Sequence, residues 1–183
     1  LNLGYLAVPS LNDTALAIPL AIQAGLGEYG RHGMVITREF GPRVRFGKIF
    51  TNAPMAFDNQ IEFGVTKFCE NCRKCTDACP PKAIPDGEPS PVKLNLSSIS
   101  GVKKWSVDGE KCFSYWGKIV SDCMICMRVC PYNKDFTKFR HRIGLRLAST
   151  KLRNIMLMLN DLFDYGERLK PKAWWNGESR RRI

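Results

Sequence analysis

Eight cysteines, seven of them in two runs, are the residues whose types and spacing predict chemistry in this chain. The first run has gaps of two, two and three residues and ends in a proline: Cys69, Cys72, Cys75, Cys79 and Pro80. The second run has gaps of two and three residues and also ends in a proline: Cys123, Cys126, Cys130 and Pro131. In bacterial ferredoxins, the first of these spacings places three thiolates on one iron–sulfur cluster and the fourth on a second cluster. The cysteines therefore predict two four-iron clusters.

The second run lacks one cysteine of the full pattern. Ser121 and Asp122 occupy the stretch where an earlier ligand would stand, and Cys112 is the one spare thiol that can replace it. All eight thiols are then used, four for each cluster. The predicted ligand sets are Cys69, Cys72, Cys75 and Cys130 for one cluster, and Cys79, Cys112, Cys123 and Cys126 for the other.

Disulfide bridges and zinc sites are the alternatives for these cysteines. An even number of cysteines in a small exported domain can form bridges. Three cysteines separated by two-residue gaps point instead to one common centre. Zinc sites usually combine two cysteine pairs across a loop, without a further thiol three residues on. Both alternatives are disfavoured.

The chain is basic, and most of the excess charge lies near its C-terminus. It has 28 Lys and Arg against 17 Asp and Glu, a net charge of +11. Residues 132–183 hold thirteen basic and five acidic residues, which accounts for +8. Such a surface can bind nucleic acid, anionic lipid or an acidic redox partner, or can simply be a solvated face. With 44% apolar and 25% charged residues, one or two globular domains are expected.

Two patterns predict the elements that precede the cysteines. Residues 13–24 favour a helix capped by Asp13, which Pro19 could shorten. The apolar, β-branched segments 34–37 and 44–51 flank a Gly-Pro turn signal, and we expect them to form a hairpin.

Within and after the cysteines the pattern changes. The first run is expected to lead into a short helix, and residues 81–104 are a connector rich in Pro, Gly and Ser. Residues 135–165 have the spacing of two helices that break near Ser149. Metal ligation, more than a large core, is expected to stabilise the cysteine-rich half.

The segments before the cysteines resemble a known family. Residues 24–33 read Ala-Gly-Leu-Gly-Glu-Tyr-Gly-Arg-His-Gly, and residues 40–45 read Phe-Gly-Pro-Arg-Val-Arg. Taken alone, these glycines specify only tight turns and close backbone approach, and no phosphate-loop pattern accompanies them. As an ordered series that continues through Lys48, Phe50-Thr51 and residues 63–65 into the cysteines, they resemble the second half of the catalytic chain of corrinoid-dependent reductive dehalogenases.

The resemblance implies an α+β chain of three parts. Residues 1–61 would be the C-terminal part of a nitroreductase-like, cobalamin-binding α/β core. Residues 62–136 would be a ferredoxin-like domain with two 4Fe-4S clusters, and residues 137–183 a basic helical unit. The resemblance also implies that this chain is an incomplete catalytic subunit.

The resemblance further implies a reaction and its cofactors, which are two 4Fe-4S clusters and cobalamin. In that family, electrons pass through the clusters to the corrin cobalt, which removes halide from an organohalide. The cofactor does the difficult chemistry while the protein positions it. The cluster that uses Cys112 is expected to be the one nearer the corrin.

The same resemblance implies catalytic and cofactor-binding residues. The family uses a tyrosine proton donor whose acidity is raised by a neighbouring Lys or Arg, and Lys48 matches that partner. A cation beside a phenol favours the phenolate, although Lys48 could also be a solvated lysine on a strand. The tyrosine itself is expected before Leu1. Contacts to cobalamin are expected from Tyr29, Gly30, Gly33 and Met34.

Two further residues are expected at the substrate pocket. Asn12 is one, with a turn or capping role as the alternative. Trp116 is the other, with packing beside Cys112 as the alternative. His32 and His141, the only two histidines, lie in no ligand motif.

Two other functions compete with this interpretation. Epoxyqueuosine reductase, a cobalamin and two-cluster enzyme that acts on tRNA, usually has Gly-Leu-Gly-Trp-x-Gly-Lys, whereas this chain has Glu28 and Arg31 at the distinguishing positions. A non-catalytic two-cluster electron-transfer protein is the third candidate.

The resemblance also implies partners and a location. The partners would be a small organohalide, an electron donor protein or membrane quinol system, and a small membrane-anchor subunit, with no nucleic acid. The protein would be membrane-associated, at the outer (periplasmic) face of the cytoplasmic membrane. No targeting segment is recognisable in the sequence, and the apolar run 155–159 is far shorter than the roughly 20 residues that a membrane helix needs.

Overall fold

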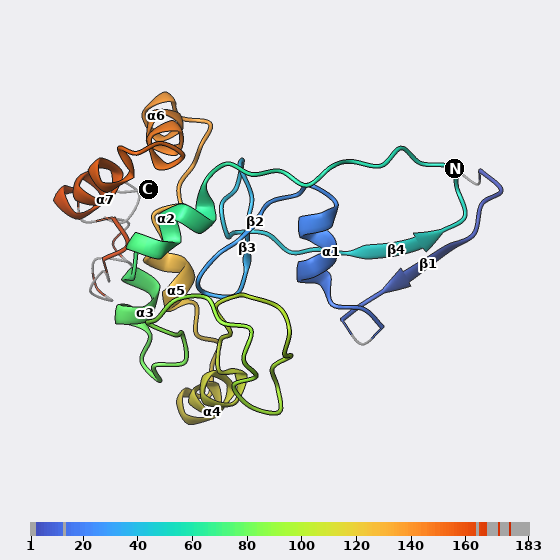
Figure 1. The fold of residues 1–183 in the computed structure, drawn as a ribbon, viewed down its shortest axis with the longest axis horizontal. Coiled ribbons are helices and arrows are strands. Elements are labelled where there is room, and N and C mark those ends of the chain that lie inside the picture. The colour runs from blue at the N-terminus through green and yellow to red at the C-terminus, as the bar shows by residue number, and fades with distance from the viewer. Residues whose placement is uncertain (1–2, 13, 164, 168–171, 173–175, 177–183) are drawn as a thin grey trace.

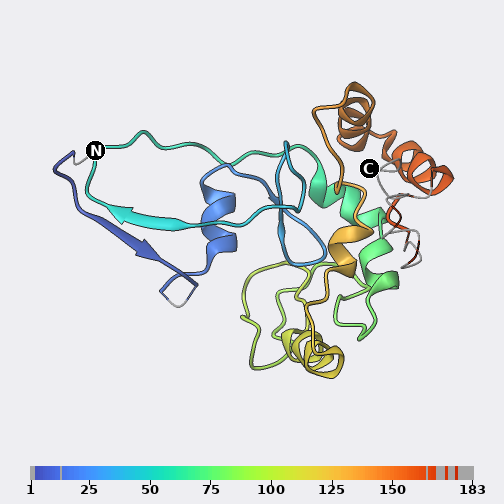
Figure 2. The same cartoon turned by 180° about the vertical axis from the view of Figure 1, so that it is seen from behind.

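Helices dominate the cysteine-rich half of the chain, and two small sheets precede them. The computed structural model describes residues 3–12, 14–163, 165–167, 172 and 176. A helical body carries an arm that projects to one side (Figures 1 and 2). This mixture of helix and sheet agrees with the expected α+β class. The elements are β1 (Ala7–Ser10), α1 (Ala17–Gln23), β2 (Glu28–Tyr29), β3 (Val35–Ile36), β4 (Lys48–Thr51), α2 (Val65–Asn71), α3 (Lys74–Ala78), α4 (Gly109–Ile119), α5 (Ile125–Arg128), α6 (Phe139–Ala148) and α7 (Arg153–Leu162).

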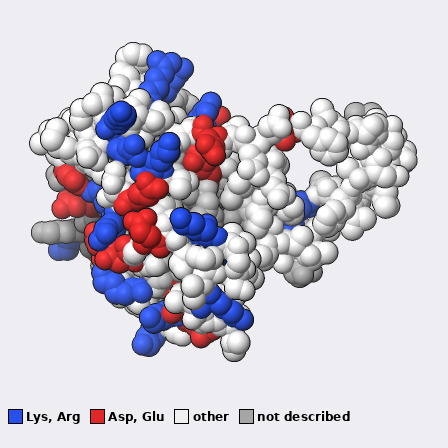
Figure 3. Space-filling model, viewed as in Figure 1, with Lys and Arg blue, Asp and Glu red and all other residues white. Residues whose placement is uncertain are grey.

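The arm is an antiparallel ribbon of β1 and β4. Its register pairs Ala7 with Thr51 and Ser10 with Lys48. Apolar side chains such as Phe50 are exposed along it, and the arm is almost free of charged residues in the space-filling view (Figure 3). This register places Lys48 at the end of the ribbon that lies beside α1 (Figure 1).

The expected hairpin between residues 34–37 and 44–51 is wrong. Strand β3 pairs with β2, and β4 pairs with β1. The glycines explain the first pairing, because the Gly30 amide donates to the Met34 carbonyl at 2.9 Å and Gly33, with φ of +81°, closes a tight turn. The Gly-Pro signal does mark a turn, but that turn is closed by a bridge between Thr37 and Gly41 and does not join two strands.

Helix α1 is shorter than residues 13–24. It begins at Ala17, so Pro19 lies in its first turn, where a proline removes no intrahelical hydrogen bond. The predicted cap, Asp13, lies outside the described residues. Instead, the side-chain oxygen of Asn12 accepts a hydrogen bond from the Ala17 amide at 3.0 Å.

Short helices carry cysteines of the first run, which was expected to be a loop that leads into one short helix. Helix α2 contains Cys69 and α3 contains Cys75, and the connector that follows the run is irregular apart from a bridge between Ser90 and Lys104. Helix α4 was not expected from the sequence. Asp108 begins it by accepting a hydrogen bond from the Lys111 amide at 3.0 Å, which is an ordinary N-cap.

The two predicted C-terminal helices are confirmed as α6 and α7, and the break includes Ser149. The main core lies between these helices and α2, where Phe68 packs edge-on against Tyr132 with ring centroids 5.1 Å apart. Basic and acidic side chains are interspersed over the face of the body that Figure 3 shows. Among the described residues, none of the helices has the length and apolar character needed to cross a bilayer.

Candidate iron–sulfur and cofactor site

All eight cysteines are free thiols that the fold brings to the middle of the body. Four are buried and form the first run, and the other four are partly buried. Helices α2, α3, α4 and α5 carry one thiol each: Cys69, Cys75, Cys112 and Cys126. Two of the others are placed where a helix ends, Cys72 after α2 and Cys79 after α3. The elements therefore converge on the thiols although the cysteines span more than sixty residues of sequence.

One group of thiols consists of Cys69, Cys72, Cys75 and Cys130. Burial, with smaller contributions from the neighbouring thiols of Cys72 and Cys75, raises the pKa of the Cys69 thiol to about 12. Burial also raises the pKa of Cys130 well above its ordinary value, and the thiols of Cys69, Cys72 and Cys75 add to that rise. These four side chains are thus close enough to interact electrostatically. They are the predicted members of the first ligand set.

The other group consists of Cys79, Cys112, Cys123 and Cys126. Burial, with smaller contributions from the thiols of Cys123, Cys112 and Cys79, raises the pKa of Cys126 to about 11. The pKa of Cys112 is raised by burial, then by Cys79 and Cys123. All four line a cavity of about 290 Å³. Cys75 links the two groups, because the thiol of Cys126 contributes to its raised pKa.

This donor set fits two clusters better than single ions. Among the described residues, no three Cys, His, Asp or Glu side chains converge closely enough to bind one metal ion. A four-iron cluster spreads its four thiolates further apart than the tetrahedral shell of one zinc ion does, at about 2.3 Å from the metal. The thiols must lose their protons to become ligands, so the raised pKa values mean that cluster assembly is coupled to proton release.

The glycine-rich segment contacts the cysteine half directly. A Cβ on Gly41, where φ is +59°, would lie 1.9 Å from the Tyr132 carbonyl oxygen, and a Cβ on Gly33 would lie 2.9 Å from Val107. The Tyr29 hydroxyl donates to the Trp105 carbonyl at 3.1 Å, and burial raises the pKa of Tyr29 to about 12. The segment therefore fixes the position of the cysteine half, a role that we did not predict for it.

A second cavity, of about 480 Å³, brings Asn12, Met34 and Lys48 together. The Lys48 ammonium donates to the Leu11 carbonyl at 2.6 Å and also to the carbonyl of Ala15. Lys48 therefore closes the loop between β1 and α1 while its charge lies at the cavity wall. Among the residues that line these two cavities, Met34 belongs to both.

Trp116 and His32 line the thiol cavity, not the cavity at Lys48. The indole nitrogen of Trp116 and Nε2 of His32 are buried without a hydrogen-bond partner among the described residues. Burial lowers the pKa of His32 to about 4, and its Nδ1 accepts a hydrogen bond from the Met34 amide at 3.2 Å. The structure thus places Trp116 beside Cys112 and apart from Asn12.

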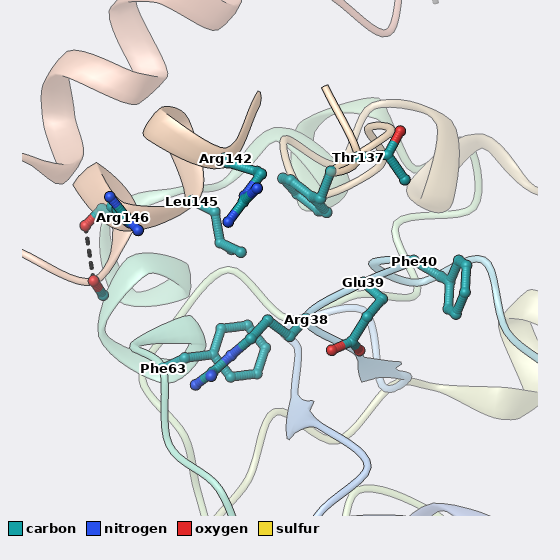
Figure 4. A pocket seen from close by; sticks show the side chains of 10 residues that line it. Arg38, Glu39, Phe40, Phe63, Thr137, Arg142, Leu145 and Arg146 are labelled. Atoms are coloured by element: carbon teal, nitrogen blue, oxygen red, sulfur yellow. Dashed lines mark hydrogen bonds between the residues drawn. The ribbon is translucent and has the colours of Figure 1, made fainter. Parts of the chain in front are cut away.

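A third cavity, of about 560 Å³, contains none of the predicted site residues. Figure 4 shows Arg38 against the ring of Phe63, with Arg142 and Arg146 from α6 across the cavity. The Arg38 guanidinium carbon lies 5.3 Å from the centre of that ring. This third cavity shares no lining residue with the thiol cavity or with the cavity at Lys48.

Sequence reasoning missed two buried charged residues of the glycine-rich segment. Glu28 is 7% exposed, and its carboxylate accepts hydrogen bonds from the amides of Phe63, Val65 and Thr66 at the start of α2. Arg31 is 1% exposed and donates to backbone carbonyls, Cys69 among them. The sequence did hold a sign of these roles: Glu28 and Arg31 are charged residues among small and apolar neighbours, and a tight turn alone does not require a charged residue.

Comparisons with known proteins agree with this geometry. Residues 68–133 match the family model described as a 4Fe-4S double cluster binding domain. The tetrachloroethene reductive dehalogenase of Sulfurospirillum multivorans is 38% identical over 177 residues, which are 96% of this chain and 35% of the relative. A solved reductive dehalogenase described in terms of B12-dependent dehalogenation is 31% identical, with a TM-score of 0.76 over 90% of this chain and 24% of its own.

The chain is also similar to epoxyqueuosine reductases, the competing candidate family. Epoxyqueuosine reductase of Lactococcus garvieae is 30% identical over 134 residues, 70% of this chain and 36% of the relative. That match covers less of the chain at lower identity than the dehalogenase match does. The chain spans between a quarter and about half of the length of the curated relatives that it matches. By sequence and by fold, the chain belongs to the reductive dehalogenases and corresponds to the C-terminal portion of their catalytic subunit.

Proposed function

We propose that the protein removes halide from an organohalide at a cobalamin cobalt, and that this portion delivers the electrons through two 4Fe-4S clusters. One observation carries the proposal: Met34 lines both the thiol cavity and the cavity at Lys48. A cofactor bound against Met34 would therefore border the second cluster on one side and Lys48 on the other. Bound cobalamin would supply a strongly reducing metal centre, and the clusters would supply single electrons.

The proposed ligand sets follow the two groups of thiols. Cys69, Cys72, Cys75 and Cys130 would bind the cluster that lies deeper in the helical body. Cys79, Cys112, Cys123 and Cys126 would bind the cluster beside the cavity that Met34 shares. The interaction between Cys75 and Cys126 supports an arrangement in which the two clusters are neighbours, which keeps the electron path short.

The cobalamin-facing surface would be formed by Tyr29, Gly30, Gly33 and Met34. The Tyr29 hydroxyl donates to the Trp105 carbonyl. The contacts of this stretch to cobalamin would therefore come mainly from its backbone and from the Met34 side chain. The 480 Å³ cavity would form one wall of the cofactor site. Asn12 would both cap α1 and border this wall, and Trp116 would border the cluster side.

Lys48 is the proposed basic partner of the proton donor. Its ammonium is fixed by two backbone carbonyls and has no carboxylate among its described hydrogen-bond partners. A fixed cation at the cavity wall would favour the phenolate of a nearby tyrosine after that tyrosine has given up its proton.

We also propose how the chain is divided into parts and which partners serve it. Residues 1–61 would complete a nitroreductase-like cobalamin core, residues 62–136 would form the ferredoxin-like domain, and residues 137–183 would form a helical unit. An electron donor protein or quinol system, with a small membrane-anchor subunit, would serve the enzyme at the outer face of the cytoplasmic membrane.

The proposal is tested with protein expressed from the complete gene and reconstituted without oxygen. We expect about eight irons and eight sulfides per chain, and halide release from a chlorinated alkene with reduced viologen only after cobalamin uptake. Half of that iron content would contradict two clusters. Halide release that is indifferent to cobalamin would contradict the mechanism.

Substitution of Lys48 tests the proposed partner of the proton donor. Lys48→Gln is expected to lower the rate of halide release by about 100-fold, because positioned acid–base groups contribute 10²–10⁴-fold, and Lys48→Arg should restore part of it. Lys93→Gln, at an exposed lysine in the connector, is the matched control. An unchanged rate in Lys48→Gln, with clusters and cobalamin bound, would remove Lys48 from the mechanism.

The rival functions give different results in the same preparation. Reduction of epoxyqueuosine in tRNA without halide release would assign the chain to the tRNA enzyme. Two clusters without cobalamin uptake would leave electron transfer alone.

A further inference from the structure

Arg31 is a buried cation whose partners are neutral. Its side chain is 1% exposed and lies at the centre of the contact between the glycine-rich segment and the cysteine half. The guanidinium donates to five backbone carbonyls: Cys69 at 3.0 Å, Glu70 at 3.4 Å, Pro85 at 3.0 Å, Asp86 at 3.1 Å and Gly87 at 2.9 Å. It also stacks over the Trp105 ring, 4.7 Å from the ring centre. Each of its three nitrogens has at least one acceptor, but these neutral groups do not neutralise its charge.

The nearest acidic residues do not supply the missing negative charge. Arg31 takes part in none of the ion pairs among the described residues. Asp86, whose carbonyl it binds, directs its carboxylate to Arg73 at 3.1 Å. An unpaired charge in the interior is costly unless something compensates it.

The thiols of the first group are the nearby groups that can become negative. The Arg31 guanidinium donates to the carbonyl of Cys69 at 3.0 Å and to that of Glu70, the next residue, at 3.4 Å, so its charge lies beside the backbone that presents this group of thiols. The buried guanidinium therefore lies next to the proposed ligand set of one cluster. None of its described hydrogen bonds reaches a residue of the other ligand set.

We propose that Arg31 is the counter-charge of the cluster bound by Cys69, Cys72, Cys75 and Cys130, and that it raises the reduction potential of that cluster relative to its neighbour. This inference rests on the proposed cluster ligation. One-electron reduction adds one negative charge to a cluster that is already an anion, and no bond is made or broken. A buried cation beside the cluster stabilises the reduced form more than the oxidised form. Arg31 would thus influence the reaction through the reduction potential of this cluster, without contacting substrate.

A redox titration of the cluster-loaded protein, followed by EPR spectroscopy with a dithionite-poised mediator series, tests this role. Arg31→Gln should shift one cluster to a more negative potential, by at least a tenfold change in its reduction equilibrium, or about 59 mV for one electron. The other cluster should keep its potential and so serves as an internal control. Arg31→Lys, which retains the charge, should keep both potentials near those of the parent protein even if Arg31→Gln fails to bind its full iron.

Arg73→Gln is the matched control, because it removes one positive charge next to Cys72 from a side chain that is 53% exposed and paired with Asp86. Its potentials should be nearly unchanged, since solvent screens an exposed charge. The inference is overturned if Arg31→Gln shifts the reduction potential of neither cluster, or shifts both potentials equally. It is also overturned if Arg73→Gln shifts the potentials as much as Arg31→Gln does, or if Arg31→Lys shifts the potential of one cluster as much as Arg31→Gln does. Failure of the parent protein to bind two clusters would instead overturn the proposed ligation.

Discussion

Glu28 and Arg31, three residues apart in the sequence, bind opposite ends of helix α2. Glu28 accepts hydrogen bonds from amides at the start of α2, and Arg31 donates to the carbonyls of Cys69 and Glu70 near its end. Helix ends leave backbone groups without intrahelical partners, and an anion at the N-terminus with a cation at the C-terminus also complements the helix dipole. The turn between β2 and β3 therefore fixes the helix that presents Cys69.

Loss of the Glu28 carboxylate should loosen this arrangement. Glu28→Gln keeps the shape of the side chain but turns an NH₂ group toward backbone amides, so that amides now face a donor. Hydrogen bonds to charged groups contribute about 1.5–3 kcal/mol each, and an unsatisfied buried group costs about 1–3 kcal/mol. We expect the free energy of unfolding in guanidinium chloride to fall by roughly 2 kcal/mol. Glu39→Gln, at an exposed glutamate, is the control, and an equal loss in both variants would contradict the role of Glu28.

Gly41 should not tolerate a side chain. A Cβ at this position would lie 1.9 Å from the Tyr132 carbonyl oxygen, and its φ of +59° disfavours other residues by about 1–2 kcal/mol. Gly41→Ala should therefore destabilise the protein by more than that strain alone and lower the yield of cluster-loaded protein. Gly47→Ala, where nothing lies within 4 Å and φ is not positive, should be near neutral. Similar melting temperatures for the two variants would show that the close approach at Tyr132 relaxes at little cost.

The two ligand sets can be separated by pairs of cysteine substitutions. If the sets are right, Cys69→Ser and Cys130→Ser remove the same cluster, so the double variant should retain about as much iron as either single variant. Combining Cys130→Ser with Cys112→Ser should remove both clusters. Iron and sulfide analysis with EPR spectroscopy measures this directly. Loss of both clusters from the Cys69 and Cys130 double variant would show that the sets are assigned wrongly.

The sequence was most informative where the determinants are local. The break at Ser149 is read within a few residues, and it led to the correct pair of helices. Strand pairing is not local: β4 finds its partner in β1, about forty residues earlier, and the Gly-Pro turn between 34–37 and 44–51 suggested a nearer partner. The cap of α4 could have been recognised, because Asp108 directly precedes Gly109 and a helical pattern.

The roles of Glu28 and Arg31 lay beyond the sequence for a related reason. Their partners are backbone groups 35 to 56 positions away, and a backbone carbonyl or amide has no residue type that a pattern could reveal. A glycine-rich stretch predicts a turn, but it does not predict which part of the chain the turn packs against. Met34 joining two cavities is likewise a property of the assembled fold.

His141 predicts a pH dependence that is separate from the clusters. Its Nδ1 lies 2.7 Å from the Asp135 carbonyl, which can only accept, so this nitrogen carries the proton and Nε2 faces the Tyr165 hydroxyl at 3.3 Å. Burial lowers the pKa of His141, and the neighbouring charges of Arg140, Lys134 and Lys138 lower it further, against the hydrogen bond to Asp135. The unfolded chain, with a histidine pKa of about 6.5, then binds the proton more readily than the folded chain does.

Stability should therefore be lost as the pH falls below about 6.5, while above neutrality His141 contributes no pH dependence. His141→Gln should reduce the difference in unfolding free energy between pH 7.5 and pH 5.5, although a difference from the buried His32 will remain. Arg140→Gln, which keeps the histidine but removes one charge that lowers its pKa, should give an intermediate difference. Guanidinium chloride unfolding at the two pH values, followed by circular dichroism on the three proteins, measures these differences. A pH difference as large in His141→Gln as in the parent protein would show that the interior around α6 accepts a charged imidazole without cost.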